Sequence, residues 1–324
     1  YERTGVSFDE TYYESRTYTM GRDEILKGVE NGVFYRDDKG TIWIDLTDID
    51  LDKKVLLRAD GTSLYLTQDI GTAIQRYNDW HFDRLIYVVA SEQRYHFQVL
   101  FEVLRRLGKT WADNLYHLAY GMVNLPEGKM KSREGTVVDA DDLLDGLAAM
   151  AKEEIISKGR EADVGDIDRT AEKIALAALH YYLLQTGPIK DMVFDPRESL
   201  SFSGNTGPYL QYVGARVSSM LRRESAPESV EPRTPESEEE WMLIHALAKY
   251  PEVVRDAALA YNPSLVASFL YEIAKTFSRF YHDFPIAVAE DRTVREYRLG
   301  LSAAVRSVMQ HGLNVLNIPF VERM

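Results

Sequence analysis

"DRLIYVVASEQRYHFQVLFEVLRRLGKTWADNLYHLAYGMV" (residues 83–123) contains the pattern of a strand, a helix and a second strand in succession. Residues 83–90 form a near-continuous apolar run, which is typical of a parallel strand covered on both faces. Residues 94–108 are amphipathic and end at Gly108, a helix stop signal, and residues 114–123 are rich in strand-forming side chains. This order predicts an open parallel sheet, in which ligands bind beyond the carboxyl ends of the strands.

The flanking sequence divides into an α/β part and an all-α part. Residues 41–46 and 53–59 are predicted strands, and residues 64–80 are a predicted helix that follows a turn at Asp60-Gly61. From residue 139 onward only helices are expected, at 139–158, 167–185, 203–223, 237–259, 263–282 and 292–316. Residues 224–240, rich in Glu, Ser and Pro, predict a surface connection without a core of its own.

Composition limits the classes of protein to which the chain can belong. The chain of 324 residues is 45% hydrophobic and 27% charged, which suits a globular protein of about two domains. Its net charge of -13 argues against binding nucleic acid through bulk charge, although local basic paths remain possible. The chain has no cysteine, which excludes disulfides and thiolate metal sites and makes the cytoplasm the default location. No apolar run is long enough for a membrane span.

A basic segment follows the last predicted strand of the sheet. Lys129, Lys131 and Arg133 alternate with other residues between Gly128 and Gly135. Glycines let backbone N–H groups approach an anion, and ammonium and guanidinium groups neutralise it. The segment therefore suits a phosphate-binding loop, and a solvated basic turn is the alternative reading.

Several separated stretches together resemble arginyl-tRNA synthetase, a class I aminoacyl-tRNA ligase. They are "LLRADGTSLYLTQDIGTA" (56–73), "GKMKSREGTVV" (128–138), "GNTGPYLQYVGAR" (204–216) and the closing "LSAAVRSVMQHGLNVLNIPFVERM" (301–324). The resemblance implies the C-terminal portion of a Rossmann-like class I catalytic domain over residues 1–145, a helical connection over 146–200, and a DALR-like helical anticodon-binding bundle over 201–324.

"KMKSR" resembles the KMSKS loop of class I synthetases, which closes over the phosphates of ATP. The resemblance implies ATP contacts by Lys129, Met130, Lys131, Ser132 and Arg133. Ser132 stands where the family has its second lysine, so the positive charge is shifted by one residue. We expect Lys129 to place the loop, and Lys131 or Arg133 to neutralise the phosphates.

Tyr65 and Asp69 are candidate contacts for an arginine substrate. They lie four residues apart on a predicted helix and so share a face, and a guanidinium group needs a carboxylate and planar neighbours. By resemblance they match the arginine-contacting tyrosine and aspartate of the family, and Gln93 matches its substrate-site glutamine. Without the resemblance, Tyr65 reads as a core aromatic and Asp69 as a solvated carboxylate. His96 reads as a structural histidine that could also lie near ATP.

Tyr209 and Tyr212 are candidate RNA contacts. They lie three residues apart at the start of a predicted helix, and tyrosine rings stack on unpaired bases. By resemblance both match anticodon-facing tyrosines, and Met324 matches a residue that contacts the anticodon loop. A core position for one of the tyrosines is the alternative.

The family's second ATP motif, His-x-Gly-His, is absent from the sequence. The resemblance therefore implies a partial arginyl-tRNA synthetase that lacks the half of the catalytic domain with this motif. The intact enzyme is expected to use Mg·ATP, arginine and its tRNA, to form arginyl-adenylate, and to be a cytoplasmic monomer without a bound metal or membrane contact. The chain alone is expected to be inactive.

Two other readings stay open. Another class I synthetase with a similar bundle, such as the cysteinyl enzyme, would be expected to use cysteine ligands for zinc, and this chain has none. A non-catalytic tRNA-binding module would need the bundle only, and would have no use for Tyr65, Asp69 or the basic segment.

Overall fold

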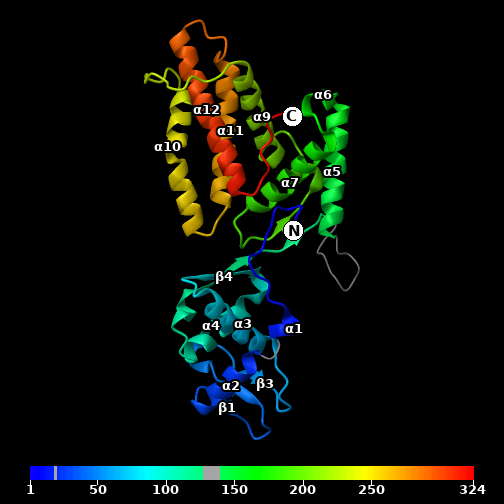
Figure 1. Cartoon of the computed structure of the whole chain (residues 1–324), viewed down its shortest axis with the longest axis vertical. Coiled ribbons are helices and arrows are strands. Elements are labelled where there is room, and N and C mark those ends of the chain that lie inside the picture. The colour runs from blue at the N-terminus through cyan, green and yellow to red at the C-terminus, as the bar shows by residue number, and fades with distance from the viewer. Residues whose placement is uncertain (18–19, 127–138) are drawn as a thin grey trace. The chain divides into compact units, whose positions relative to one another are not determined.

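The structure is a computed structural model, and it describes residues 1–17, 20–126 and 139–324. The chain divides into two compact units, Tyr1–Gly121 and Met122–Met324 (Figure 1). Each unit has its own hydrophobic core, so each is described by itself.

The strand–helix–strand pattern of residues 83–123 is confirmed. Strand β4 (Leu85–Ala90) pairs in parallel with β5 (Leu115–Tyr120), so that Leu85 lies opposite Leu115 and Ala90 opposite Tyr120. Helix α4 (Arg94–Arg106) makes the crossover, preceded by the 3-10 helix η2 (Ser91–Gln93) and followed by η3 (Thr110–Asn114). The buried face of α4 follows its amphipathic pattern, because Leu100, Val103 and Leu104 are fully buried.

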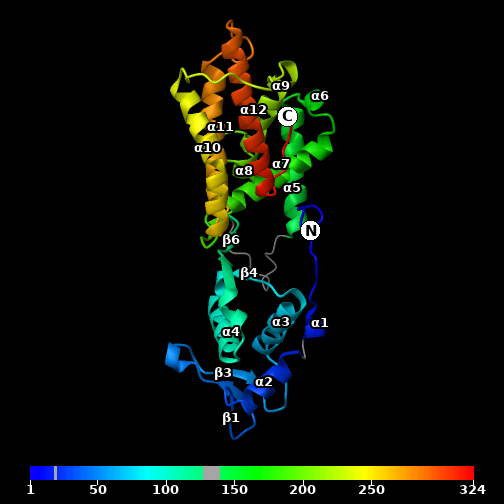
Figure 2. The same cartoon turned by 60° about the vertical axis from the view of Figure 1, so that its left-hand side comes forward.

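The remainder of the first unit is a small antiparallel sheet packed with helices. Strands β1 (Tyr35–Arg36), β2 (Ile42–Ile44) and β3 (Lys54–Leu57) pair in that order, beside η1 (Thr47–Ile49). Helix α3 (Tyr65–Trp80) contacts both β3 and α4 (Figure 2). No prediction was made from the sequence for helices α1 (Glu14–Thr17) and α2 (Met20–Glu30).

Two glycines allow α2 and α3 to cross at very short range. A Cβ atom added to Gly21 would lie 1.7 Å from the carbonyl oxygen of Thr67, and one added to Gly71 would lie 2.4 Å from the backbone nitrogen of Gly21. No larger residue fits at either position without moving a helix backbone. This contact fixes the position of α3, the helix that begins at Tyr65.

The second unit begins with a strand pair that contradicts the expectation of helices alone. Strand β7 (Met192–Val193) pairs in parallel with β6 (Val123–Asn124), and the prediction of no strand after residue 139 is therefore wrong. A strand of two residues has no periodicity to detect, and its partner lies far away in the sequence. Helices α5 (Ala140–Ser157) and α7 (Ile167–Leu184) pack together, with the short helices α6 (Glu161–Val164) and α8 (Pro196–Ser199) beside them.

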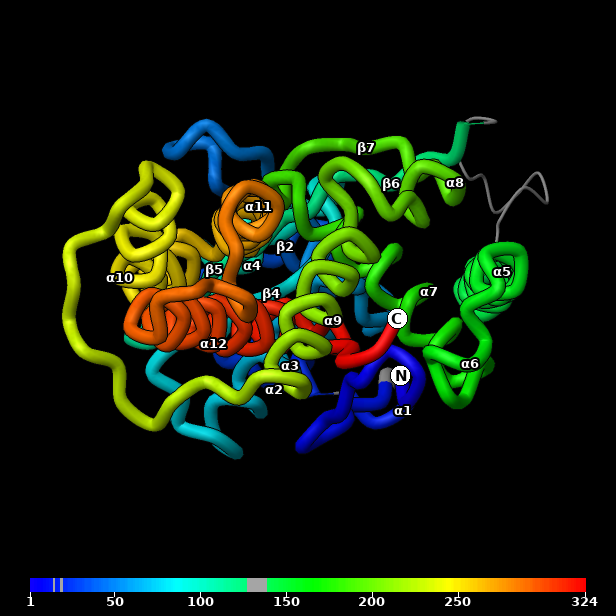
Figure 3. Tube along the Cα trace, turned by 90° about the horizontal axis from the view of Figure 1, so that it is seen from above, coloured from blue at the N-terminus to red at the C-terminus, as the bar shows by residue number. Residues whose placement is uncertain are grey.

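The predicted bundle is confirmed. It consists of α9 (Gly207–Arg223), α10 (Glu238–Leu259), α11 (Ser264–Asp283) and α12 (Arg292–Val315). Figures 1 and 2 show α10, α11 and α12 side by side, and Figure 3 views them from above. Phe277, Phe280 and Val305 lie in a core that α9 and α12 share with α7.

Among the described residues, no helix combines the length and apolarity that a membrane span requires.

Candidate functional site

Helix α3 is anchored to the small sheet just before its candidate site residues. The turn at Asp60-Gly61 closes through a hydrogen bond from the Thr62 backbone N–H to the Asp60 side chain at 2.9 Å. Thr67 donates its hydroxyl to the carbonyl oxygen of Leu56 on β3. Helix α3, whose first two turns carry Tyr65 and Asp69, therefore has a fixed start.

The structure joins Asp69 to His96. His96 Nε2 donates to Asp69 Oδ2 at 2.6 Å, with 26% and 46% of their side chains exposed. Gln93 is exposed at the start of α4, three residues before His96 and just beyond the carboxyl end of β4. These residues thus lie where parallel sheets bind their ligands.

Tyr65 is not a core residue. Its side chain is 78% exposed, which excludes the alternative reading of a buried aromatic. Tyr65 and Asp69 lie one helical turn apart on α3, as the spacing predicts. The residues predicted to bind ATP, Lys129, Met130, Lys131, Ser132 and Arg133, lie outside the described residues.

In the second unit, α9 starts against α7 at very short range. A Cβ atom on Gly207 would lie 2.0 Å from the carbonyl oxygen of Ala177, so only glycine fits there. The Thr206 side chain accepts a hydrogen bond from the Tyr209 backbone N–H at 3.3 Å and caps the helix. This start fixes the directions in which Tyr209 and Tyr212 point.

The two tyrosines of α9 have different surroundings. The Tyr209 hydroxyl lies 3.1 Å from Ser278 Oγ on α11, and its ring meets Tyr271 edge-on at 5.9 Å between centroids. Tyr209 is therefore half-buried against the bundle core, as the alternative reading allowed for one of the pair. Tyr212 instead lines a surface groove.

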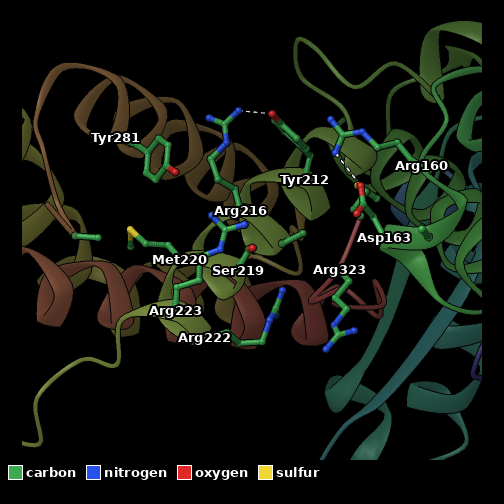
Figure 4. Close-up of a pocket in the computed structure, with 14 residues that line it drawn as sticks. Arg160, Asp163, Tyr212, Arg216, Ser219, Met220, Arg222, Arg223, Tyr281 and Arg323 are labelled. Atoms are coloured by element: carbon green, nitrogen blue, oxygen red, sulfur yellow. Dashed lines mark hydrogen bonds and ion pairs between the residues drawn. The ribbon is translucent and has the colours of Figure 1, made fainter.

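Arg216 sits between two aromatic rings in that groove (Figure 4). Its Cζ atom lies 4.5 Å from the centre of the Tyr212 ring and 5.3 Å from that of Tyr281, and it donates to the Tyr212 hydroxyl. A guanidinium group held by rings keeps its full charge while its position is fixed.

The groove has a volume of about 560 Å³ and is strongly basic. Among the described residues, the charged side chains of its lining are Arg160, Arg216, Arg222, Arg223, Arg323 and a single carboxylate, Asp163. Asp163 is 3.6 Å from Arg160, so most of the positive charge is not neutralised within the groove. Such a local excess of cations on an acidic chain favours a polyanionic ligand.

Met324 also lines the groove and packs on an apolar cluster that contains Ile155 and Ile174. The final residues are held in place because Gln211 donates to the carbonyl oxygen of Pro319 at 2.7 Å and Arg222 donates to that of Glu322 at 3.0 Å. The structure therefore brings Tyr212 and Met324 to one groove, as their shared predicted role requires, and places Tyr209 beside the core.

Sequence reasoning missed the arginines and Tyr281. One signal was available, because Tyr212, Arg216, Ser219 and Arg223 follow a spacing of four, three and four residues along α9. This spacing places all four on one helix face. Arg160, Tyr281 and Arg323 come from other elements and join the groove only through the tertiary fold.

Two models of known protein families together match most of the chain. The model described as "tRNA synthetases class I (R), catalytic domain" matches residues 1–196, and the "DALR anticodon binding domain" matches residues 210–324. The chain belongs to the arginyl-tRNA synthetase family. The partial arginyl-tRNA synthetase expected from the sequence, with a class I catalytic portion followed by a DALR-like bundle, is thereby confirmed.

Individual relatives agree with this family. The chain is 56% identical to the arginine–tRNA ligase of Treponema denticola, with all of this chain and 56% of the relative covered. It is 47% identical to the arginine–tRNA ligase of Porphyromonas gingivalis, covering 100% of this chain and 55% of that one. The chain therefore spans about half the length of the curated relatives it matches.

A solved structure supports the fold of this synthetase chain. The arginyl-tRNA synthetase of Thermus thermophilus aligns with a TM-score of 0.87 at 25% identity, covering 100% of this chain and 61% of that one. A methionyl-tRNA synthetase of Mycobacterium tuberculosis, 12% identical, aligns with a TM-score of 0.65 over 98% of this chain and 76% of that one. This second similarity shows a shared fold only.

Proposed function

We propose that the chain carries part of an arginine–tRNA ligase, which attaches arginine to its tRNA with ATP through an arginyl-adenylate. The observation that carries the proposal is the arginine-lined groove around Tyr212 in a bundle of the DALR family. Residues 1–145 would belong to the catalytic part, 146–200 to a helical connection, and 201–324 to the anticodon-binding part.

The bundle would bind the anticodon loop of the tRNA. Arg216 and its neighbours on α9 would contact phosphates, and the Tyr212 ring, already fixed by Arg216, would stack on an unpaired base. Met324 borders the same groove and would add an apolar contact. Tyr209, which contacts Ser278 and Tyr271 on α11, would contribute mainly to the packing of α9 in the bundle.

The first unit would hold the arginine substrate. Asp69 supplies a carboxylate for the guanidinium group, and Tyr65 is exposed one helical turn before it. Since His96 already donates to one oxygen of Asp69, an incoming guanidinium group would share this carboxylate with the imidazole. Gln93 would add an amide contact.

The chemistry needs positioning and phosphate neutralisation more than a protein nucleophile. Lys129, Lys131 and Arg133 would neutralise the α-phosphate and the leaving pyrophosphate of Mg·ATP. The intact enzyme would be a cytoplasmic monomer, and the prediction that the chain alone does not aminoacylate stands with this proposal.

Binding of the chain to an arginine tRNA, compared with the same tRNA carrying a mutated anticodon, tests the proposal. Tyr212→Ala should weaken binding of the first RNA by about tenfold, because stacking of one base on an aromatic ring contributes about 1–3 kcal/mol. Tyr209→Phe, which removes only the hydroxyl next to Ser278, is the matched control and should bind nearly as wild type. Weak binding that ignores the anticodon would reject the assignment of the bundle.

A non-catalytic RNA-binding module is the other candidate, and the match of a class I catalytic domain to residues 1–196 argues against it. An arginine site should raise the Tm of the chain when free arginine is added, because a ligand that binds the native state stabilises it. Asp69→Asn should abolish that rise. A chain stabilised by tRNA and unaffected by arginine would favour the RNA module.

A further inference from the structure

Residues 318–324, called the terminal segment below, form no helix or strand, although all of them lie in the described part of the chain. Their backbone therefore lacks the hydrogen-bond ladder that fixes a regular element. Two of the residues, Arg323 and Met324, nevertheless line the groove. Their place beside the groove depends on side chains of other elements that hold the segment.

Arg306 on α12 binds this segment and α9 at the same time. Its Nη2 atom lies 2.5 Å from Glu322 Oε1, and its Nε donates to Ser218 Oγ on α9 at 2.9 Å. The centre of the Phe320 ring, also in the segment, lies 5.4 Å from Arg306 Cζ. One guanidinium group thus contacts two separate parts of the chain, for which its planar fork of donors is suited.

Phe320 packs on α9 where the helix lacks a side chain. A Cβ atom added to Gly214 would lie 2.6 Å from the Phe320 ring, so the ring occupies the space of that side chain. Gly214 and Ser218 lie about one helical turn apart on α9. The terminal segment therefore follows the face of α9 that carries these two residues, and Arg306 bridges the helix and the segment.

Glu322 connects this contact to the groove. Its side chain binds Arg306, and its backbone carbonyl oxygen accepts a hydrogen bond from Arg222 Nη1 at 3.0 Å. Arg222 lines the groove, and so does Arg323, the next residue along the segment (Figure 4). The position of Glu322 therefore decides where two arginines of the groove lie. Arg306 itself is not among the described residues that line the groove.

We propose that Arg306 is a positioning residue for RNA binding, which acts through Glu322 on Arg222 and Arg323. The inference rests on the proposed function and extends it to a residue outside the groove. Because Arg306 fixes the terminal segment before RNA binds, it lowers the entropic cost of ordering two long side chains on the phosphates. A preformed groove therefore binds RNA more tightly than the same charges on a loose segment.

Arg306→Lys tests the proposal because it keeps the positive charge and removes the fork of donors. One lysine ammonium group cannot take the places of both Nε and Nη2, so the segment loses one of its anchors. This variant should bind a labelled hairpin with the anticodon loop of an arginine tRNA about fivefold more weakly than wild type, measured by fluorescence anisotropy. Arg292→Lys is the matched control on the same helix, because Arg292 pairs with Glu296 and does not line the groove.

Glu322→Ala distinguishes positioning from charge by the sign of its effect. Loss of a carboxylate beside a basic groove should strengthen RNA binding if charge alone matters. If Glu322 holds the segment, the same variant should instead weaken binding about threefold. Glu322→Gln keeps an oxygen that accepts from Arg306 and should bind at least as tightly as wild type. Because the Glu322 side chain is 59% exposed, neither substitution disturbs the core.

A double-mutant cycle separates positioning from a general loss of structure. In a chain that already carries Arg222→Gln and Arg323→Gln, Arg306→Lys should change the affinity no further, because its effect passes through these two side chains. Without RNA, hydrogen exchange at the amides of residues 321–323 should become faster in Arg306→Lys, while the amides of α10 keep their rates.

The outcomes separate the two proposals. If the hairpin binds in a manner that depends on Tyr212, while Arg306→Lys binds as tightly as the control variant, the inference fails and the proposed function stands. An undiminished effect of Arg306→Lys in the double-mutant cycle, tighter binding by Glu322→Ala, or unchanged exchange in the terminal segment also overturns the inference. If wild type binds no hairpin, the proposed function fails and the inference fails with it.

Discussion

Substitution of Arg223 by glutamine should reduce the salt dependence of RNA binding by a calculable amount. Of the arginines that line the groove, Arg160 is partly compensated by Asp163, which leaves Arg216, Arg222, Arg223 and Arg323. If each neutralises one phosphate of a single-stranded loop, log K falls against log salt with a slope of about -2.8, from about -0.7 per phosphate. Removal of Arg223 should change the slope to about -2.1.

This difference is large enough to measure. Between about 50 and 200 mM salt, wild type should lose about 50-fold in affinity and Arg223→Gln about 20-fold. The assay is anisotropy of a labelled anticodon hairpin at several salt concentrations. Arg255→Gln is the matched control, because Arg255 is exposed on α10, pairs with Glu252 and Asp256, and does not line the groove. A slope for Arg223→Gln equal to that of Arg255→Gln would refute the electrostatic reading of the groove.

Three further predictions concern stability. Glu240→Ala should lower the free energy of unfolding by about 3 kcal/mol and the Tm by about 6–12 °C, because it removes the nearer carboxylate of a buried ion pair. The guanidinium group of Arg298, 7% exposed and 3.0 Å from Glu240, would keep only a longer contact of 3.6 Å to Glu236 and a hydrogen bond to the carbonyl oxygen of Pro285. Calorimetry would show the change, and a Tm shift below about 2 °C would contradict it. Gly207→Ala should lower the free energy of unfolding in urea by about 1–3 kcal/mol, because the added Cβ would lie 2.0 Å from a carbonyl oxygen of α7. Gly146→Ala, in open space on α5, should instead raise it by up to about 1 kcal/mol. Equal effects of the two substitutions would refute the close contact at Gly207. Burial raises the pKa of Tyr87 to about 12, so the unfolded chain loses the phenolic proton of this residue at a lower pH than the folded chain does. The free energy of unfolding should therefore fall as the pH rises from about 10 toward 12. Tyr87→Phe should flatten this part of a plot of stability against pH, and an unchanged plot would contradict the pKa shift.

The proposed amino-acid site shows how far local spacing can go. The spacing of Tyr65 and Asp69 was enough to place them on one face of α3, because helical geometry is set by neighbouring residues. The partner of Asp69 could not be derived in this way. His96 lies on another helix, α4, 27 residues away in the sequence, and it contacts Asp69 only because α3 and α4 pack together.

In the bundle, too, local spacing predicts only part of the groove. The face of α9 that carries Tyr212 and Arg216 can be read from the sequence, but the second ring beside Arg216 belongs to Tyr281 on α11. The exposure of Tyr65 and the partial burial of Tyr209 were likewise settled by packing. A side chain's burial depends on which element covers it, and the covering element is a long-range contact.

By itself, the sequence determined the strand–helix–strand unit, the helices of the bundle and, through its motifs, the family. Periodicity of apolar residues and the turn and capping residues encode these features over short distances along the chain. Only the tertiary structure decided the pairing of β6 with β7, the crossing of α2 and α3 at Gly21 and Gly71, and the gathering of arginines around one groove. These features join residues that are far apart in the sequence. Contacts between helices and strands, rather than the order of neighbouring residues, determine them.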